Sequence, residues 1–190
     1  MTDLSFATLM PTYVSRFANC VTSPAHTADL AACLAKIQAG RGQYQQAGHP
    51  LGIPWYFIAI LHGMECGFNF NTHLHNGDPL TARTVHVPAG RPLAGSPPFP
   101  WIASAQDALT FQGFKALTDW SVPRILYRFE RYNGMGYQER ATPSPYLWSF
   151  SNQYTQGKFA ADGAWDPNLV SRQCGAAVML KALGDLSALG

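Results

Sequence analysis

Apolar residues recur at helical spacing along most of the chain, and this pattern predicts a mainly helical protein. Ser-Pro and Asp-Pro pairs open several of these segments, and Gly residues close them, as helix ends require. The expected helices cover residues 3–22, 24–46, 54–66, 102–118, 122–132 and 167–183. We expect a single domain over residues 1–190, with the N-terminal helices (1–48) packed on the rest.

One long segment, residues 67–100, lacks a helical pattern and is rich in Gly, Pro, Asn and Thr. Within it, residues 81–88 alternate well enough for a short strand or hairpin arm. A segment of this length inside a compact domain is more often a functional loop than a linker. The expected fold is therefore mainly α, with a small β-hairpin or loop element after the helix at 54–66.

Composition narrows the function classes. The chain has 190 residues, of which 47% are hydrophobic and 13% charged, so disorder is excluded. A net charge of +2 without Lys/Arg runs gives little electrostatic basis for nucleic-acid binding. The N-terminal segment lacks the features of a secretory signal, and no stretch approaches the roughly 18 apolar residues of a membrane span. We expect a monomer, made in the cytoplasm, without stable membrane insertion.

Glu65 ends the most apolar of the helical segments. It lies four residues after Leu61 and seven after Ile58, so its carboxylate is expected on the same face as these buried aliphatics. Burial without a cationic partner raises the pKa of a carboxyl group, and a carboxylic acid protonated near neutrality suits general acid catalysis. The alternative interpretation is a carboxylate that only ends a core helix and points outward.

A second carboxylate follows in the polar segment. Glycoside hydrolysis usually needs two carboxyl groups, and Asp78, after the turn-forming Asn76-Gly77, is the candidate base. Thr84 and Thr81 are expected to hold the attacking water, with Thr84 counted among the catalytic residues. Arg83 would bind a substrate carboxylate or pair with Asp78. The structural alternatives are an Asx turn and ordinary strand-forming threonines.

A third group stands near the end of the predicted helix at 122–132. Tyr132 and Asn133, followed by Gly134, offer a ring, an amide and an exposed turn. These features suit stacking and hydrogen bonding to an N-acetyl sugar. Tyr132, Asn133 and Tyr137 are therefore expected to bind substrate in the same cleft as Glu65. Taken alone, Asn133-Gly134 is also an ordinary helix C-cap.

The apolar helix ending at Glu65, the polar segment after it and Tyr132-Asn133-Gly134 together resemble the lysozyme superfamily. More narrowly, the chain is similar over about residues 50–180 to goose-type lysozymes, soluble lytic transglycosylases and a phage-type endolysin group. The stretches that carry the narrower resemblance are 53–92, 144–148 and 154–159. The resemblance implies an α+β lysozyme-like fold, Glu65 as general acid and Asp78 at the position of a following acidic residue.

The resemblance also implies a function. It indicates a muramidase that acts on peptidoglycan glycan strands without a cofactor, and a phage or prophage endolysin that reaches the cell wall in the periplasm after release. One departure is that Cys66 follows Glu65, where the family commonly has Ser.

Four other functions compete with the muramidase. A lytic transglycosylase would use the same acid. A zinc-dependent peptidoglycan amidase or peptidase would use the clustered histidines, although no HExxH motif is present. A Cys-His peptidase would need Cys66 at the start of a helix instead of its end. A wall-binding module would not turn over substrate. The clustered histidines of the zinc alternative are His49, His62, His73, His75 and His86.

The four cysteines show no CxxC spacing, and we expect buried free thiols and no metal site. They are Cys20, Cys33, Cys66 and Cys174.

Overall fold

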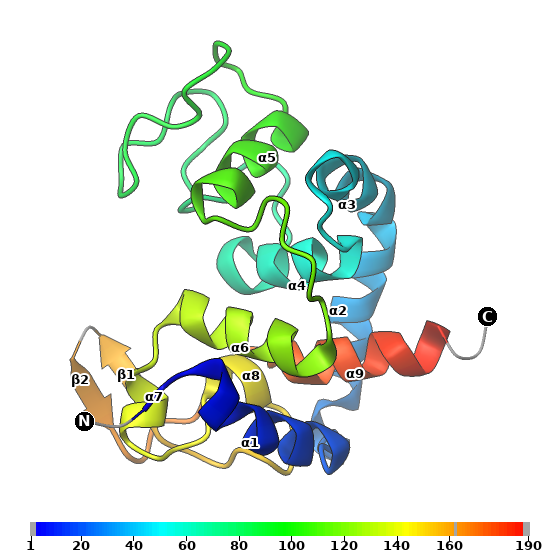
Figure 1. Ribbon diagram of the computed structural model, residues 1–190, viewed down its shortest axis with the longest axis vertical. Helices are drawn as coiled ribbons and strands as arrows, with labels where there is room; N and C mark the ends of the chain where they lie inside the picture. Colours follow the sequence, from blue (N-terminus) through cyan, green and yellow to red (C-terminus); the bar gives the residue numbers. More distant parts are fainter. Residues whose placement is uncertain (1–2, 162, 188–190) are drawn as a thin grey trace. The chain divides into compact units, whose positions relative to one another are not determined.

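The computed structural model describes residues 3–161 and 163–187 (Figure 1). The chain divides into two compact units, Met1–Leu34 with Trp120–Gly190 (unit 1) and Ala35–Asp119 (unit 2). Unit 1 holds α1 (Phe6–Ala18), α6 (Val122–Asn133), α7 (Gly136–Glu139), α8 (Pro145–Trp148), α9 (Ala176–Ser187), β1 (Lys158–Ala161) and β2 (Ala164–Asp166). Unit 2 holds α3 (Arg41–Gly48), α4 (Trp55–Cys66) and α5 (Trp101–Phe111). Helix α2 (Thr27–Ala39) contains the boundary.

In unit 1, α1 packs against α6, and its two ends are held by polar contacts. The Ser5 side chain accepts from the Thr8 N–H at 3.4 Å, which satisfies a donor that the helix start leaves unpaired. At the other end, Lys181 Nζ donates to the carbonyls of Phe17 (3.0 Å), Ala18 (3.0 Å) and Cys20 (2.8 Å). A cation favours a helix C-terminus, where carbonyls carry partial negative charge.

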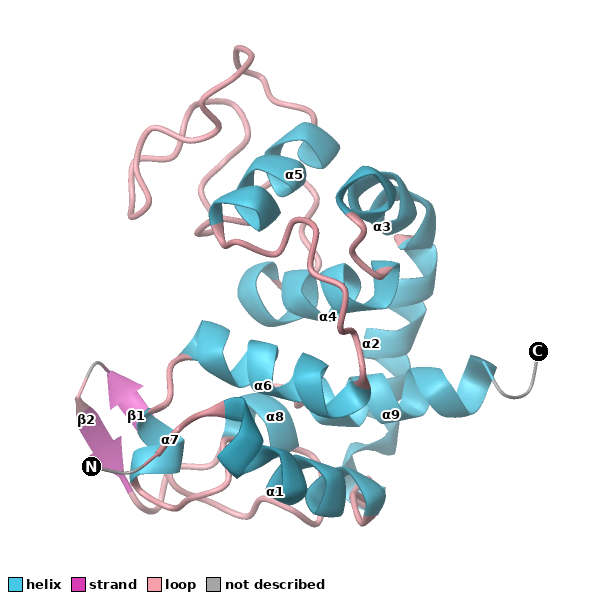
Figure 2. Cartoon of the chain, viewed as in Figure 1, coloured by secondary structure: helices cyan, strands magenta, loops and turns pink. Residues whose placement is uncertain are grey.

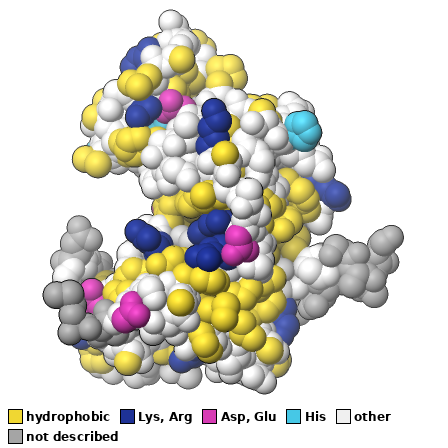
Figure 3. All heavy atoms as spheres, in the orientation of Figure 1, with side chains coloured by type: hydrophobic (Ala, Val, Ile, Leu, Met, Phe, Trp, Pro, Cys, Tyr) yellow, Lys and Arg dark blue, Asp and Glu magenta, His cyan; other side chains and the backbone are white. Residues whose placement is uncertain are grey.

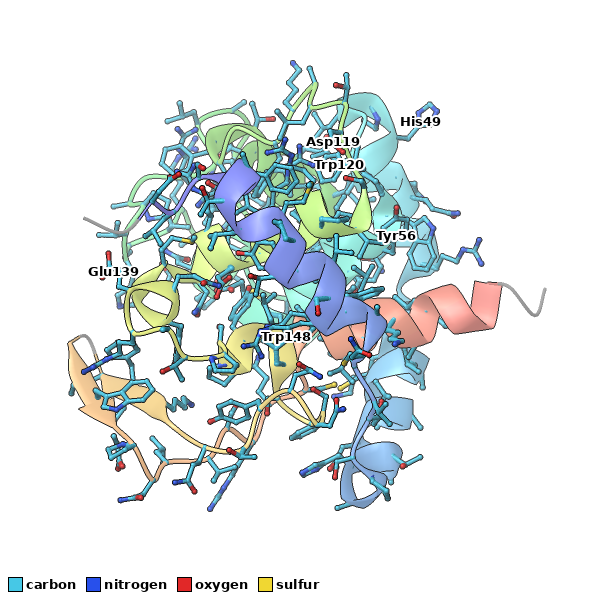
Figure 4. All side chains as sticks on the ribbon, turned by 60° about the horizontal axis from the view of Figure 1, so that its bottom comes forward. His49, Tyr56, Asp119, Trp120, Glu139 and Trp148 are labelled. Carbon is cyan, nitrogen blue, oxygen red and sulfur yellow. The ribbon has the colours of Figure 1, made fainter. Side chains whose placement is uncertain are left out.

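Helices α8 and α9 complete the core of unit 1. Trp148, labelled in Figure 4, is only 1% exposed. Gly175, just before α9, allows a close backbone approach, since a Cβ there would lie 2.3 Å from the Leu147 carbonyl oxygen. Helix α9 begins at Ala176, directly after this glycine, so the expected helix start near residue 167 is wrong. Residues 166–168 form an Asx turn instead, in which Asp166 accepts from the Asn168 N–H at 2.8 Å.

The small β element lies elsewhere than the sequence predicts. β1 and β2 pair antiparallel, with Phe159 opposite Trp165, in the part of the chain expected to be loops and turns. Residues 81–88 form no strand, so the expected hairpin arm there is wrong. Figure 2 shows the chain between α4 and α5 as loop, with one isolated bridge between Thr72 and Pro79 in its described residues. The coarse prediction of a mainly α fold with a small β element is confirmed.

Unit 2 is built around α4, which lies beside α3, with α5 on α3. Gly40 separates α2 from α3, although a single helix over 24–46 is expected from the sequence. A Cβ on Gly40 would lie 2.6 Å from Cε2 of Tyr44, so only glycine fits under that ring. No helix in the described part of the chain is long and apolar enough to cross a membrane.

Candidate active site

Glu65 lies in the last turn of α4, where the helix leaves the core. All residues from Phe57 to Met64 are buried, so α4 is enclosed on every side. Glu65 itself is exposed. The prediction of a buried Glu65 is therefore wrong, because helical spacing identifies a buried face only when the helix also has an exposed one. The structure instead presents this carboxylate at the surface, in the last turn of a helix whose middle is buried.

The backbone around Glu65 is fixed by the way α4 ends. Gly67 is left-handed (φ 57°), and its N–H donates to the Gly63 carbonyl at 3.2 Å. The chain then turns back, and the Phe68 N–H donates to the His62 carbonyl at 3.4 Å. A Cβ on Gly63 would lie 2.3 Å from Cζ of Phe68, so this glycine makes room for the ring. The position of Glu65 is thus set by contacts on both sides of it.

His62 is a core residue. Its Nδ1 accepts from the Tyr44 hydroxyl at 2.9 Å, and its Nε2 donates to the Asn69 carbonyl at 3.1 Å, a tautomer assigned from these two partners. The ring lies 4.8 Å from that of Trp101. Burial lowers the pKa of His62 to about 4, so the ring is neutral near pH 7. Both ring nitrogens are occupied, which favours a structural role over zinc binding.

His73 and His75 are also engaged inside unit 2. His73 Nδ1 accepts from the Ser104 hydroxyl at 2.6 Å, and Nε2 donates to the Ala82 carbonyl at 2.8 Å. His75 Nε2 contacts Asp107 Oδ2 at 2.8 Å. Among the described residues, no group of three or more His, Cys, Asp or Glu side chains is arranged to hold a metal ion.

Asp78 is bound by its own loop. Its Oδ2 accepts from the N–H groups of Val85 (2.8 Å) and His86 (3.0 Å) and from Asn76 Nδ2 (3.0 Å), and its Oδ1 accepts from His86 Nδ1. These bonds, first of all the one from the His86 backbone, lower the pKa of Asp78. The residue is 7% exposed. A stabilised carboxylate is a weak base, so the visible role of Asp78 is to hold the loop. Its action as the base stays a prediction.

Thr84 is likewise occupied. Its hydroxyl donates to the Pro88 carbonyl and accepts from the Arg91 N–H at 2.9 Å, and the residue is buried. These bonds favour a role in closing the loop over a role in holding a water. Thr81 is exposed. Arg83 donates a hydrogen bond to the Gly95 carbonyl at 2.8 Å, which is a contact within the same loop.

The substrate-binding candidates of unit 1 differ in their surroundings. Helix α6 ends at Asn133, as the sequence predicts, and Asn133 is exposed while Tyr132 is half-buried. Tyr137 is buried, and its hydroxyl accepts from the Phe159 N–H at 3.2 Å while its ring meets that of Trp165 edge-on. The contacts of Tyr137 therefore support the hairpin, and direct substrate contact by this residue is not favoured. Glu65 belongs to unit 2 and these residues to unit 1.

Comparisons with known proteins give no match: no family model, no curated protein and no solved structure matches the chain significantly. The candidate site therefore depends on the residues themselves and on the resemblance that their pattern carries.

Sequence reasoning missed Asp107, which connects two parts of the loop to α5. Besides His75, it binds Arg91 Nη1, at 3.2 Å from Oδ1. Burial lowers the pKa of His75, and the hydrogen bond that its ring donates to Asp107 opposes that effect. Little in the sequence points to this network, because its three members are far apart along the chain.

Sequence reasoning also missed Glu130, a fully buried glutamate in α6 with 0% exposure. Its Oε2 accepts from the Tyr13 hydroxyl at 2.5 Å and from Gln138 Nε2 at 2.7 Å, whereas its buried Oε1 has no hydrogen-bond partner among the described residues. Burial raises the pKa of Glu130. Its place next to Phe129 and four residues after Leu126 was the available signal.

Helix α6 also carries arginines that lie over aromatic rings. Arg124 lies 3.4 Å from the Phe6 ring centroid, and Arg131 lies 5.9 Å from that of Tyr127. On the face shown in Figure 3, Lys and Arg side chains gather over α6. This helix, which ends in Tyr132 and Asn133, is therefore basic and aromatic together.

Replacing Asp78 by Ala is expected to loosen the loop without unfolding unit 2. The amides of Val85 and His86 lose their acceptor, so their hydrogen exchange should become at least ~10-fold faster. Because the pKa of Asp78 is lowered, its stabilisation is present above its ordinary value of 3.8 and is lost as pH falls below it. Exchange followed by NMR measures the effect, with Asp166→Ala as control. Unchanged exchange at both amides would contradict the loop-holding role.

Proposed function

We propose that the protein is a muramidase that hydrolyses the β-1,4 bond between N-acetylmuramic acid and N-acetylglucosamine, with Glu65 as the proton donor. The observation that carries the proposal is the exposed carboxylate of Glu65, fixed at the end of a helix that is otherwise enclosed. A general acid must reach the glycosidic oxygen in a defined geometry, which a rigid helix end provides. The resemblance to goose-type lysozymes and endolysins points to the same residue.

Substrate binding itself supplies the protonated acid in this proposal. A sugar ring that covers Glu65 removes water from its carboxylate, and loss of hydration favours the neutral form. The proton is then available to the leaving oxygen in the bound complex.

The binding residues of the proposal are those of the polar loop and of the end of α6. Tyr132 offers a ring to the sugar, and exposed Asn133 offers its amide to an acetamido group. Thr81 and Arg83 belong to the loop after Glu65. The arginines of α6 suit a glycan strand that carries muramyl and peptide carboxylates. The protein would act as a monomer and without a cofactor.

A lytic transglycosylase with the same acid is the second candidate, and one observation favours it. The hydrogen bonds of Asp78 and Thr84 within the loop occupy the groups expected to hold an attacking water. A transglycosylase needs no such water, because the muramic 6-hydroxyl attacks instead and closes an anhydro ring.

Mass spectrometry of muropeptides from purified walls separates the two candidates. The muramidase is expected to give reducing muropeptides, whereas products lighter by one water would identify a transglycosylase. A parallel digest with a commercial muramidase supplies the reference masses. Released peptides with intact glycan strands would instead indicate an amidase or peptidase.

In the cell, we propose that the protein is a phage or prophage endolysin, made in the cytoplasm and released to the wall during lysis. A processed N-terminus on protein recovered from the periplasm would contradict this route.

A further inference from the structure

Unit 1 contains a pocket of about 400 Å³ that the proposed reaction does not use. Its walls come from residues 21–26, from residues 149–155 and from Val170 with Ser171. The volume lies in the roughly 300–1,000 Å³ range of small-molecule sites. All of these residues belong to one unit, so the pocket is defined by that unit alone.

Two loop segments pair to form the frame of the pocket. The Ser23 N–H donates to the Phe150 carbonyl at 2.9 Å, and the Asn152 N–H donates to the Val21 carbonyl at 3.0 Å. The Asn152 side chain closes the pair by accepting from the Val21 N–H at 2.9 Å. Backbone pairing of this kind holds the pocket in shape before a ligand arrives, which lowers the entropy cost of binding.

An aromatic pair lies at the pocket. The rings of His26 and Phe150 are stacked, with centroids 3.8 Å apart and planes 2° from parallel. Phe150 has a left-handed backbone (φ 72°), which bulky residues rarely adopt. Such strained residues concentrate at binding sites. The backbone at Phe150 is therefore held in a conformation that places its ring against His26.

The polar groups that line the pocket are mostly hydroxyls, with one amide and the His26 ring. Its lining contains no Asp, Glu, Lys or Arg. The hydroxyls of Thr22, Ser23 and Thr155 make no hydrogen bond within the described part of the chain. Val21 and Val170 add apolar surface, with 62% and 52% of each residue exposed. The pocket thus combines apolar contact with uncommitted hydroxyls.

We propose that this pocket binds a neutral carbohydrate of about one or two sugar rings. A sugar presents hydroxyls to the free Thr and Ser groups and C–H faces to the half-buried His26 ring, which Phe150 supports from behind, and to the valine surface. An anion would find no Lys or Arg in the lining, and a purely apolar ligand would leave the hydroxyls unpaired. The assignment goes beyond the muramidase proposal and does not depend on Glu65.

The test is an NMR titration of the Glu65→Gln protein, which excludes turnover, with N,N′-diacetylchitobiose and with cellobiose as separate probes. At least one sugar is expected to shift the amides of Thr22, Phe150 and Thr155 saturably. Thr155→Val and His26→Ala should weaken that binding at least ~10-fold, because each removes a contact group. The matched controls Thr12→Val in α1 and His49→Ala in the turn after α3 should change it less than ~2-fold.

Two outcomes would overturn the assignment: no shift at these amides with either sugar, or binding that is unchanged in both pocket variants. Thermal unfolding of each variant verifies that it is folded. Wall clearance by the wild-type protein is measured separately. Clearance without sugar binding at the pocket overturns only this inference, and sugar binding without clearance overturns only the muramidase proposal.

Discussion

Glu65→Gln is expected to reduce the rate of wall clearance at least ~10²-fold, because the amide keeps the shape of the side chain but has no proton to give to the leaving oxygen. Stability should hardly change, since Glu65 is exposed at the end of α4. Clearance of purified walls, followed by turbidity, measures the rate. A thermal unfolding curve on the same preparation verifies the fold.

Glu139→Gln is the matched control. Glu139 is an exposed glutamate at the end of α7 in unit 1, labelled in Figure 4, so this variant makes the same chemical change outside the proposed site. It should clear walls at the wild-type rate. If Glu65→Gln did so too, Glu65 would not be the acid. If the wild-type protein and both variants bound walls tightly but did not clear them, the protein would be a wall-binding module.

Glu130→Ala is expected to destabilise unit 1 by roughly 2–5 kcal/mol. The substitution leaves the Tyr13 hydroxyl and the Gln138 amide without their shared acceptor, and each unsatisfied buried group costs about 1–3 kcal/mol. Denaturant unfolding of the full chain measures the loss. Glu139→Ala, which removes an exposed glutamate, should stay within about 0.5 kcal/mol of wild type. Equal stability of the two variants would contradict a structural role for Glu130.

The pH dependence of stability provides a second readout for Glu130. Because burial raises its pKa in the folded state, the protonated form stabilises the fold. This contribution is complete below the ordinary value of 4.5 and is lost as pH rises through the folded pKa. Glu130→Gln cannot ionise. Its unfolding free energy should therefore rise relative to wild type as pH increases above about 4.5, whereas an unchanged difference would contradict a raised pKa.

Elements with strong local signals could be predicted from the sequence. Helix α6 ends at Asn133 because Gly134 follows, and α4 begins after Pro54, as proline and glycine placement indicates. The β hairpin was not predictable in the same way. Phe159 and Trp165 meet the Tyr137 ring edge-on, and nothing near β1 in the sequence specifies that partner.

Asp78 and Glu65 show why the candidate site was harder to predict. Sequence reasoning identified both carboxylates but not how each is surrounded. Asp78 is surrounded by backbone N–H groups of Val85 and His86, and such donors have no sequence signature. Glu65 lies at the end of a helix that is buried on all sides. In such a helix, the spacing of apolar residues does not indicate which way a given side chain points. The same spacing rule, applied to α6, would have found buried Glu130.

The contact between Lys181 and the end of α1 has a consequence for the order in which the chain folds during synthesis. Residues 35–119 form one continuous stretch, so unit 2 has all of its residues once Asp119 has left the ribosome. Helix α1 is made before unit 2, yet Glu130 and Lys181, which bind Tyr13 and the carbonyl of Phe17, are made after it. Helix α1 must therefore wait until α6 has been made before its apolar side is covered, and this interval is when a holding chaperone has most to protect.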